Sequence, residues 1–336
     1  MLRFLIGRIL AAIPVLLVLS IVTFAIIKAP AGDYGDYIRQ QMMNQGGASF
    51  EEAEAQANAY RKAHGLLDPL PLQYFHWIGG IVTRGDFGDS FFFNKPVARV
   101  VAERLPATLM IALSCHILAS LFGISLGILA ATHQYSWLDT LLSAFAFIGT
   151  TVPRFLMAII ILYILAFKLN VQEFGSFYSA QYGGAPWSLA KLGNLIQHIW
   201  PVVFVATFAG LAYNMRVMRG NLLDTLNAQY IETARAKGLP ESAVILRHAV
   251  PNALHPLVMY QGVVLPYMLT GEIETAIVFA IPTVGPAIVL AMGQGDVNVT
   301  ATFMLILAAT LIVGNIIADL LLVLLDPRIR MSGVRA

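Results

Sequence analysis

The amino-acid sequence predicts an all-α integral membrane protein, and three observations lead to that fold class. Hydrophobic residues make up 58% of the 336 residues, and the mean hydropathy is +0.72. Charged residues make up 12%, against about 25% in a typical soluble domain. The apolar residues also gather in six blocks, each long enough to cross a hydrocarbon core of about 30 Å.

Composition and motifs exclude several classes of function. The net charge of +2 is too small for a nucleic-acid-binding surface. The single cysteine, Cys115, excludes an internal disulfide and lies in an apolar block, as a packing residue would. The chain has no Cys/His spacing typical of a metal site, no GxxxxGK[ST] phosphate loop and no HExxH. We therefore expect no catalytic residue, bound metal or cofactor.

The first block, Ile9–Ile27, follows two arginines and precedes the sequence APA at residues 29–31. A cleaved secretory signal peptide is the alternative interpretation of this pattern. The apolar core of a signal peptide spans about 7–15 residues, so this longer run favours an uncleaved span that begins in the cytoplasm. We assign residues 1–31 to the cytoplasmic start and the first transmembrane helix.

A polar segment, residues 32–100, follows this span. Ser49 and Glu52 have the spacing of a helix capping box, and Gly65 predicts the end of that helix. We expect a small folded insert outside the membrane, followed by a membrane core over residues 101–330.

The remaining spans are expected in that core. The apolar blocks are Leu105–Ala131, Leu138–Phe167, Ile199–Val217, Leu257–Ile281 and Ala301–Leu325. A short THQYSW turn predicts that the second and third spans form a helical hairpin. Gly123 and Gly127 in the second span have the small-xxx-small spacing that lets transmembrane helices approach closely.

Six spans place both chain ends on one side of the membrane, and the basic residues indicate which side. In a six-span arrangement, ten basic residues lie on the same side of the membrane as the two chain ends: Arg3, Arg8, Arg216, Arg219, Arg235, Lys237, Arg247, Arg328, Arg330 and Arg335. The positive-inside rule therefore places both termini, the tail at residues 331–336 and the loop at about 218–256 in the cytoplasm.

This loop contains the most polar stretch of the membrane core, QYIETARAKGLPESAVILRHAVPNALHPL. Gly238 predicts the end of one short helix and Pro240 the start of the next. Ala243, Leu246 and Val250 then fall on one helical face, and Pro251 is expected to bend the chain towards the fifth span. Such an element could lie in a groove of a partner protein or on the lipid surface, and composition does not choose between them.

The spacing of this stretch does choose. The stretch resembles the EAA loop of ABC importer membrane subunits, whose pattern is E-A-A-x3-G-x9-I-x-L-P. In this chain Glu232-Thr233-Ala234 is followed after three residues by Gly238, and after nine more by a tetrapeptide that ends in Pro251. The chain departs from the pattern at Thr233, His248 and Val250. Over nearly the whole chain, the sequence is similar to the first permease subunit of the dipeptide/oligopeptide importer family. Four further stretches carry this resemblance: LRFLIGRILAAIPVLLVLSIVTFAI, HGLLDPLPLQYFHWIGGIVTRGDFGDSF, ERLPATLMIAL and LLDPRIR.

The resemblance implies the type I ABC importer permease fold, with six transmembrane helices and an extracytoplasmic insert after the first. It implies a non-catalytic subunit of the bacterial cytoplasmic (inner) membrane. The implied partners are a second homologous permease, two ABC ATPase subunits that bind ATP and Mg, an extracytoplasmic solute-binding protein and the lipid bilayer. Carried over to this chain, the contact with the ATPase would involve Glu232, Thr233, Ala234, Arg235, Lys237, Gly238, Leu239 and Pro251. Arg235 and Lys237 would be rim charges, and Gly238 would need a left-handed backbone.

Three ionisable residues fall within apolar blocks and are candidates for the translocation path: Arg154, Glu272 and Glu274. In straight helices each would lie about 23–26 Å from the cytoplasmic start of its span. The alternative is a structural ion pair, or side chains that reach the outer interface. His116, on an apolar stretch, is interpreted as a packed histidine. Relatives often carry Glu-Thr directly before VFxxPGxG, whereas GEIETAIVFAIPTVG here displaces Glu274 by two residues.

Two other classes compete with an importer subunit. An ATP-independent channel or secondary carrier would show an inverted repeat and has no use for a long cytoplasmic loop. An intramembrane enzyme would need an Asp pair or His cluster at membrane depth, which the sequence lacks. Within the family, peptides, oligosaccharides, nickel complexes and glutathione all remain open as the solute.

Overall fold

A computed structural model describes residues 2–28, 32–45, 47–171 and 175–325, except for the side chains at 2–4, 26–27, 45, 261–272, 318 and 321–325. The predicted tail at 331–336, with Arg328, Arg330 and Arg335 before and within it, lies outside the described residues. The structure divides into two compact units, which are described separately. Unit 1 holds residues 1–107 and 286–309, and unit 2 holds residues 108–285 and 310–336.

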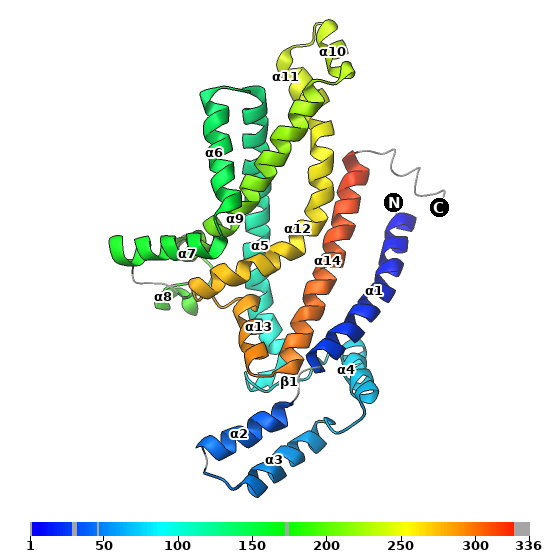
Figure 1. Ribbon diagram of the computed structural model, residues 1–336, viewed down its shortest axis with the longest axis vertical. Helices are drawn as coiled ribbons and strands as arrows, with labels where there is room; N and C mark the ends of the chain where they lie inside the picture. The colour runs from blue at the N-terminus through cyan, green and yellow to red at the C-terminus, as the bar shows by residue number, and fades with distance from the viewer. Residues whose placement is uncertain (1, 29–31, 46, 172–174, 326–336) are drawn as a thin grey trace. The chain divides into compact units, whose positions relative to one another are not determined.

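The described chain is built almost entirely of helices, as the sequence predicts (Figure 1). The α-helices are α1 (Leu2–Lys28), α2 (Tyr34–Gln45), α3 (Phe50–Ala63), α4 (Leu70–Arg84), α5 (Val97–Thr132), α6 (Trp137–Thr151), α7 (Arg154–Tyr163), α8 (Ala180–Gly183), α9 (Leu189–Leu226), α10 (Gln229–Ala236), α11 (Glu241–Ala243), α12 (Val250–Val278), α13 (Val284–Gly293) and α14 (Val297–Leu325). Two π-helical turns, η1 (Ile164–Lys168) and η2 (Val244–Ala249), and two short antiparallel strands, β1 (Asp89–Ser90) and β2 (Lys95–Pro96), complete them.

Four of the described helices are long and apolar enough to cross a membrane. They contain Leu5–Ala25, Val97–Thr132, Leu189–Leu226 and Val297–Ile317, and the bent pair α6–α7 would add a fifth span. The predicted block Leu257–Ile281 falls mainly on α12, where the side chains at 261–272 are not described. The all-α membrane fold is therefore confirmed, and the number six stays a prediction.

The third apolar block is not the single straight span that the sequence predicts. Its two halves, α6 and α7 with η1, meet at an angle of 100°. Val152 has φ −78° and ψ 124°, and Pro153 caps the start of α7. A proline disfavours the helical conformation of the residue before it, so Val152 is extended and the helix breaks there.

Unit 1 contains the polar segment that the sequence places after the first span. The capping box is present: Ser49 Oγ accepts from the Glu52 N–H, and the Glu52 carboxylate accepts from the Ser49 N–H. Helix α3 ends at Ala63, and Gly65 follows with φ +63°. Both predictions for this helix are therefore confirmed.

A buried carboxylate joins two parts of unit 1 that are far apart in the sequence. Asp296 is fully buried at the start of α14, where it accepts from the Val299 N–H. It also accepts from Ser90 Oγ at 2.6 Å and from the Phe92 N–H at 3.1 Å. Because these donors satisfy the carboxylate, its burial fixes the β1–β2 turn against the loop before α14.

Unit 2 is organised around α9, which two neighbouring helices approach at glycines. A Cβ atom on Gly127 of α5 would lie 2.7 Å from the Met215 carbonyl oxygen, and one on Gly123 would lie 2.7 Å from that of Leu211. Gly149 of α6 faces Ala212 in the same way. The predicted role of Gly123 and Gly127 in close helix packing is therefore confirmed.

The same stretch, GISLG, has the letter pattern of a GxSxG nucleophile motif. That motif requires a sharp turn from a strand into a helix, whereas Gly123–Gly127 lies inside the continuous helix α5. Ser125 Oγ donates to the Leu121 carbonyl oxygen at 2.7 Å. The pattern is therefore part of a packing surface, with the serine bonded to its own helix.

Replacing Gly127 with alanine should destabilise unit 2, because the new methyl group would overlap backbone and side-chain atoms of α9. We expect a loss of about 1–3 kcal/mol, typical of overpacking. Thermal or denaturant unfolding of the purified protein in detergent measures it. Gly220→Ala on α9 is the matched control, since its Cβ would meet open space. Equal stability of the two variants would contradict the close approach.

Candidate functional site

The predicted cytoplasmic loop folds as a compact extension of unit 2. Its core consists of ten buried residues from the ends of α5 and α9, from α10, from η2 and from the start of α12: Ala131, Met218, Leu222, Ile231, Ala234, Val244, Ala249, Val250, Ala253 and Leu257. Because one core joins the loop to three long helices, a force on the loop reaches those helices through packed side chains.

Two short helical limbs meet at the Gly-Leu-Pro break, as the sequence predicts. Helix α10 ends at Ala236, and Gly238 follows with φ +76° while its N–H donates to the Arg235 carbonyl oxygen. Pro240 then caps the start of α11. The left-handed backbone expected at Gly238 is confirmed, and the space around its Cβ position is open. The need for glycine there comes from the backbone alone.

Arg235 holds the two limbs together across this break. Its guanidinium donates to both carboxylate oxygens of Glu241, at 3.1 and 2.7 Å, and to the Leu226 carbonyl oxygen at 3.5 Å. The hydrogen bond from Arg235 lowers the pKa of the Glu241 carboxyl. Arg235 therefore has a structural partner within the loop, which the sequence interpretation as a rim charge did not include.

The second limb differs from the sequence prediction in two ways. It is a π-helical turn, η2, that continues directly into α12, with Pro251 in the first turn of that helix. The π-turn also changes the periodicity, so Leu246 is 62% exposed while Val244 and Ala249 are buried. The predicted single face of Ala243, Leu246 and Val250 is therefore wrong.

The surface of the loop combines apolar and charged side chains. Tyr230, Leu239 and Leu246 are exposed, as are Glu232 and Lys237. Ala234 belongs to the loop's own core, so its side chain is not part of this surface. Of the other predicted contact residues, Thr233 is exposed with its hydroxyl donating to the Gln229 carbonyl oxygen, and Pro251 is half-buried.

A second site in unit 2 is a polar cavity of about 730 Å³. Its lining comes from α5, the α6–α7 break, α9 and α12 and includes three charged side chains, Arg154, Arg216 and Glu274. His116, Tyr213, Asn214 and Tyr260 add polar groups, and the Tyr213 and Tyr260 rings lie 4.5 Å apart. Two arginines and one glutamate around a cavity can bind a polar solute that carries both signs of charge.

The structure brings two of the three predicted path residues to this cavity. Arg154 is half-buried at the first position of α7, and Glu274 is exposed on α12. Glu272 lies on α12, but its side chain lies outside the described residues. The depth calculated for Arg154 is wrong, because the helix bends by 100° just before it.

Other residues of the cavity lining are not predicted from the sequence. The sequence places Arg216 only among the basic residues of the cytoplasmic side and indicates a packed histidine at His116. Both line the cavity, where residues of α5, α9 and the α6–α7 break come together. The proline in TTVPR was the one local signal of that break.

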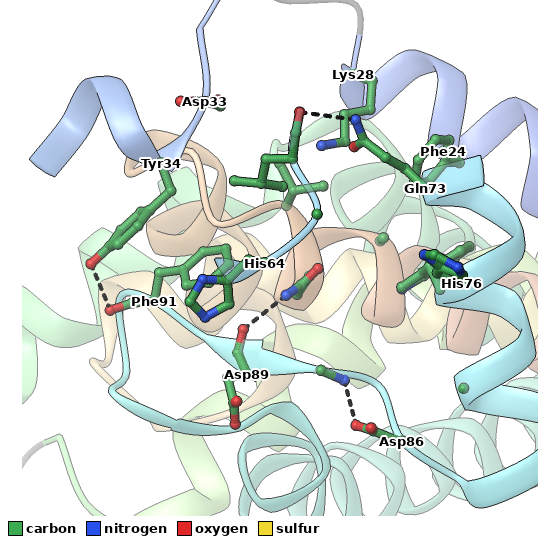
Figure 2. Close-up of a pocket in the computed structure, with 18 of the residues that line it drawn as sticks. Phe24, Lys28, Asp33, Tyr34, His64, Gln73, His76, Asp86, Asp89 and Phe91 are labelled. Atoms are coloured by element: carbon green, nitrogen blue, oxygen red, sulfur yellow. Dashed lines mark hydrogen bonds between the residues drawn. The ribbon is translucent and has the colours of Figure 1, made fainter. Parts of the chain in front are cut away.

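Unit 1 contains a smaller pocket of about 260 Å³, shown in Figure 2. Aromatic and charged side chains surround it, including Lys28, His64, His76, Asp86 and Asp89. Its wall is held by hydrogen bonds from the Tyr34 hydroxyl to the Phe91 carbonyl oxygen and from the Gly88 N–H to Asp86. Among the described residues no group of three His, Cys, Asp or Glu side chains could hold a metal ion.

Comparisons with known proteins cover both units. Residues 123–331 match the family described as binding-protein-dependent transport system inner membrane component, and residues 1–112 match the N-terminal model of such a membrane component. The oligopeptide transport system permease protein AppB of Bacillus subtilis (strain 168) is 33% identical over 330 residues, which are 98% of this chain and 99% of that protein.

Further relatives carry similar names. A probable peptide ABC transporter permease protein of Sinorhizobium fredii is 30% identical over 327 residues, 97% of this chain and 99% of the relative. A putative peptide transport system permease protein of Brucella abortus (strain 2308) is 33% identical over 323 residues, 96% and 97% of the two chains. The similarity therefore extends over both units and both candidate sites.

The left-handed backbone at Gly238 can be tested with two substitutions. Gly238→Val should loosen α10, because a left-handed conformation costs a residue with a side chain about 1–2 kcal/mol. Gly238→Asn is the control, since asparagine tolerates this conformation better. Hydrogen exchange of the α10 amides should accelerate in the valine variant only. Equal exchange in the valine variant and the parent protein would contradict the assignment.

Proposed function

The chain belongs to the family of binding-protein-dependent transport system inner membrane components, and we propose that it forms half of the translocation path of an ATP-driven peptide importer and couples to a separate ATPase through the loop at about 218–256. Family membership makes it an ABC transporter permease subunit and a multi-pass protein of the inner membrane. The loop's role as the contact with the motor is the proposal.

One observation carries the proposal for the loop. A compact, two-limbed element exposes Tyr230, Leu239 and Leu246 although it has a well-packed core of its own. A folded loop that keeps large apolar side chains at its surface suits a groove on another protein, with Glu232 and Lys237 at the rim. Leu246 is the most exposed of the three and serves as the anchor.

We propose the partners that membership of the family implies. The second permease supplies the other half of the path, two ATPase subunits bind ATP and Mg, and a solute-binding protein delivers the solute from outside. This chain itself performs no catalytic step and holds no cofactor. Six spans with both termini in the cytoplasm would place the loop on the ATPase side.

Coupling depends on the rigidity of the loop. When ATP binding closes the two ATPase subunits, the docked loop moves with them. Its core is shared with α5, α9 and α12, so the displacement is transmitted to three helices at once. Three of the elements that line the polar cavity are these same helices, and their movement therefore opens or closes the cavity.

The polar cavity is the best candidate for this chain's share of the path. Charged side chains within spanning helices are costly unless they meet water, a partner or a solute. Arg154, Arg216 and Glu274 together suit a peptide, whose ends carry a carboxylate and an ammonium group. The peptide-permease relatives favour that solute over oligosaccharides, nickel complexes or glutathione.

Leu246→Asp should disrupt assembly with the ATPase, because a charge would replace the apolar anchor at the docking surface. The variant should still insert into the membrane, since Leu246 lies outside the loop core. Co-purification of the ATPase should fall about tenfold or more, as for an interface hot spot.

Leu67→Asp is the matched control, with the same exposure of 62% but in unit 1. It should keep the ATPase bound as in the parent complex. Undiminished co-purification with the Leu246 variant would refute the proposed docking surface.

Neutral substitutions should separate a transport role of the cavity charges from a structural one. Arg154→Gln and Glu274→Gln should each lower the transport rate of a reconstituted complex about tenfold, with unchanged melting temperature and ATPase assembly. Lys168→Gln, an exposed charge outside the cavity, is the control. Loss of stability in step with transport would favour the structural ion pair instead.

A further inference from the structure

An ion pair joins α6 to α9 where both helices approach the cytoplasmic loop. Arg219 donates to Asp139 through two bonds, Nε to Oδ1 at 2.6 Å and Nη2 to Oδ2 at 2.7 Å. The Asp139 side chain is 5% exposed and that of Arg219 27%. Two parallel bonds between planar groups fix both distance and orientation, which a single contact does not do.

Asp139 is also tied to the turn that precedes α6. Its Oδ2 accepts from the Tyr135 N–H at 3.0 Å, and its own N–H donates to the capping hydroxyl of Ser136. The carboxylate therefore orders the α5–α6 turn and the first residues of α6 together. Anything that moves Asp139 moves the start of that helix.

Arg219, the partner of Asp139, lies on α9 beside residues of the loop core. It follows Met218 and precedes Leu222 by three residues, and both of these belong to the loop core. Helix α9 is continuous between Arg219 and the residues of the same helix that line the cavity, which include Arg216. Arg219 is thus fixed to the element that moves with the loop.

The far end of α6 is the α6–α7 break in the cavity wall. Thr150, Thr151, Val152 and Arg154 all line the cavity there. Gly149 packs against Ala212 of α9, ten residues or about 15 Å along the helix from Asp139. Between these two ends Leu142 and Ala146 of α6 pack with Ala212 and Met215 of α9. Helix α6 contributes no residue to the loop core, so Asp139 is its charged link to the loop end of α9.

We propose that Asp139 and Arg219 are a positioning pair that transmits displacement of the cytoplasmic loop to α6 and so to the α6–α7 break in the cavity wall. This inference rests on the proposed function, because it assumes that the loop is moved by an ATPase. Without the pair, apolar packing alone would join α6 to α9, and the wall at Arg154 would follow the loop less closely.

The test uses the complete transporter in proteoliposomes with its binding protein and ATPase. The double variant Asp139→Asn/Arg219→Gln keeps the shape and some hydrogen bonding but removes both charges. Assembly and binding-protein-stimulated ATP hydrolysis should stay within twofold of the parent complex, while solute transported per ATP falls about tenfold, the size expected of a lost coupling of 1–2 kcal/mol.

Lys95→Gln/Glu103→Gln removes an ion pair of unit 1, a single contact with a more exposed carboxylate, and should leave the ratio of transport to ATP hydrolysis unchanged. Arg219→Lys keeps the charge but not the two-point geometry, and its ratio should fall between those of the parent and the double variant.

Three results would overturn the inference: an unchanged ratio in the double variant, a parallel fall of transport and hydrolysis that marks a purely structural pair, or an equal loss in the unit 1 control. A parent complex that neither assembles with an ATPase nor shows stimulated hydrolysis would instead overturn the proposed function. The two failures are therefore distinguishable.

Discussion

The close approach of α5 and α6 to α9 is the constraint on which the rest of unit 2 depends. Gly123, Gly127 and Gly149 permit it, because the positions where their Cβ atoms would lie are occupied by α9. Within a membrane, helices gain little from excluding water, so contact of this kind stabilises their association. The result is a central helix that carries a cavity wall in its middle and a folded loop at its end.

Prolines mark two helix breaks that bear on the candidate sites, and the two breaks are not equally predictable from the sequence. The break at Gly238–Pro240 has three signals close together, a glycine stop, a proline start and a change of polarity. The break at Val152–Pro153 has one, within an apolar run that could equally be a kinked continuous span. Which outcome occurs depends on whether neighbouring helices accept a 100° turn, and that is tertiary information.

The same difference between local and tertiary information explains which features of the candidate sites can be predicted from the sequence. The membrane class follows from composition and from the length of the apolar blocks. The capping box, the packing glycines and the left-handed Gly238 each follow from a few neighbouring residues, and each agrees with the structure. The exposure of Leu246 depends on a π-turn, which local patterns do not specify. Arg216 and His116 line one cavity because separate helices come together there, and no local sequence pattern predicts that packing.

The placement of charges in unit 2 follows one physical rule. An ionised side chain inside a low-dielectric region needs a partner, water or a ligand. Asp139 and Arg219 satisfy each other with two short bonds, so they hold two helices in fixed relation. Arg154, Arg216 and Glu274 line a cavity of about 730 Å³, large enough for water or a solute to reach them. In the roles proposed above, the Asp139–Arg219 pair transmits force between two helices, and the charged side chains of the cavity wall meet the solute. The ion pair lies towards the loop end of α9, and the cavity-lining residues of α9 precede it along the helix.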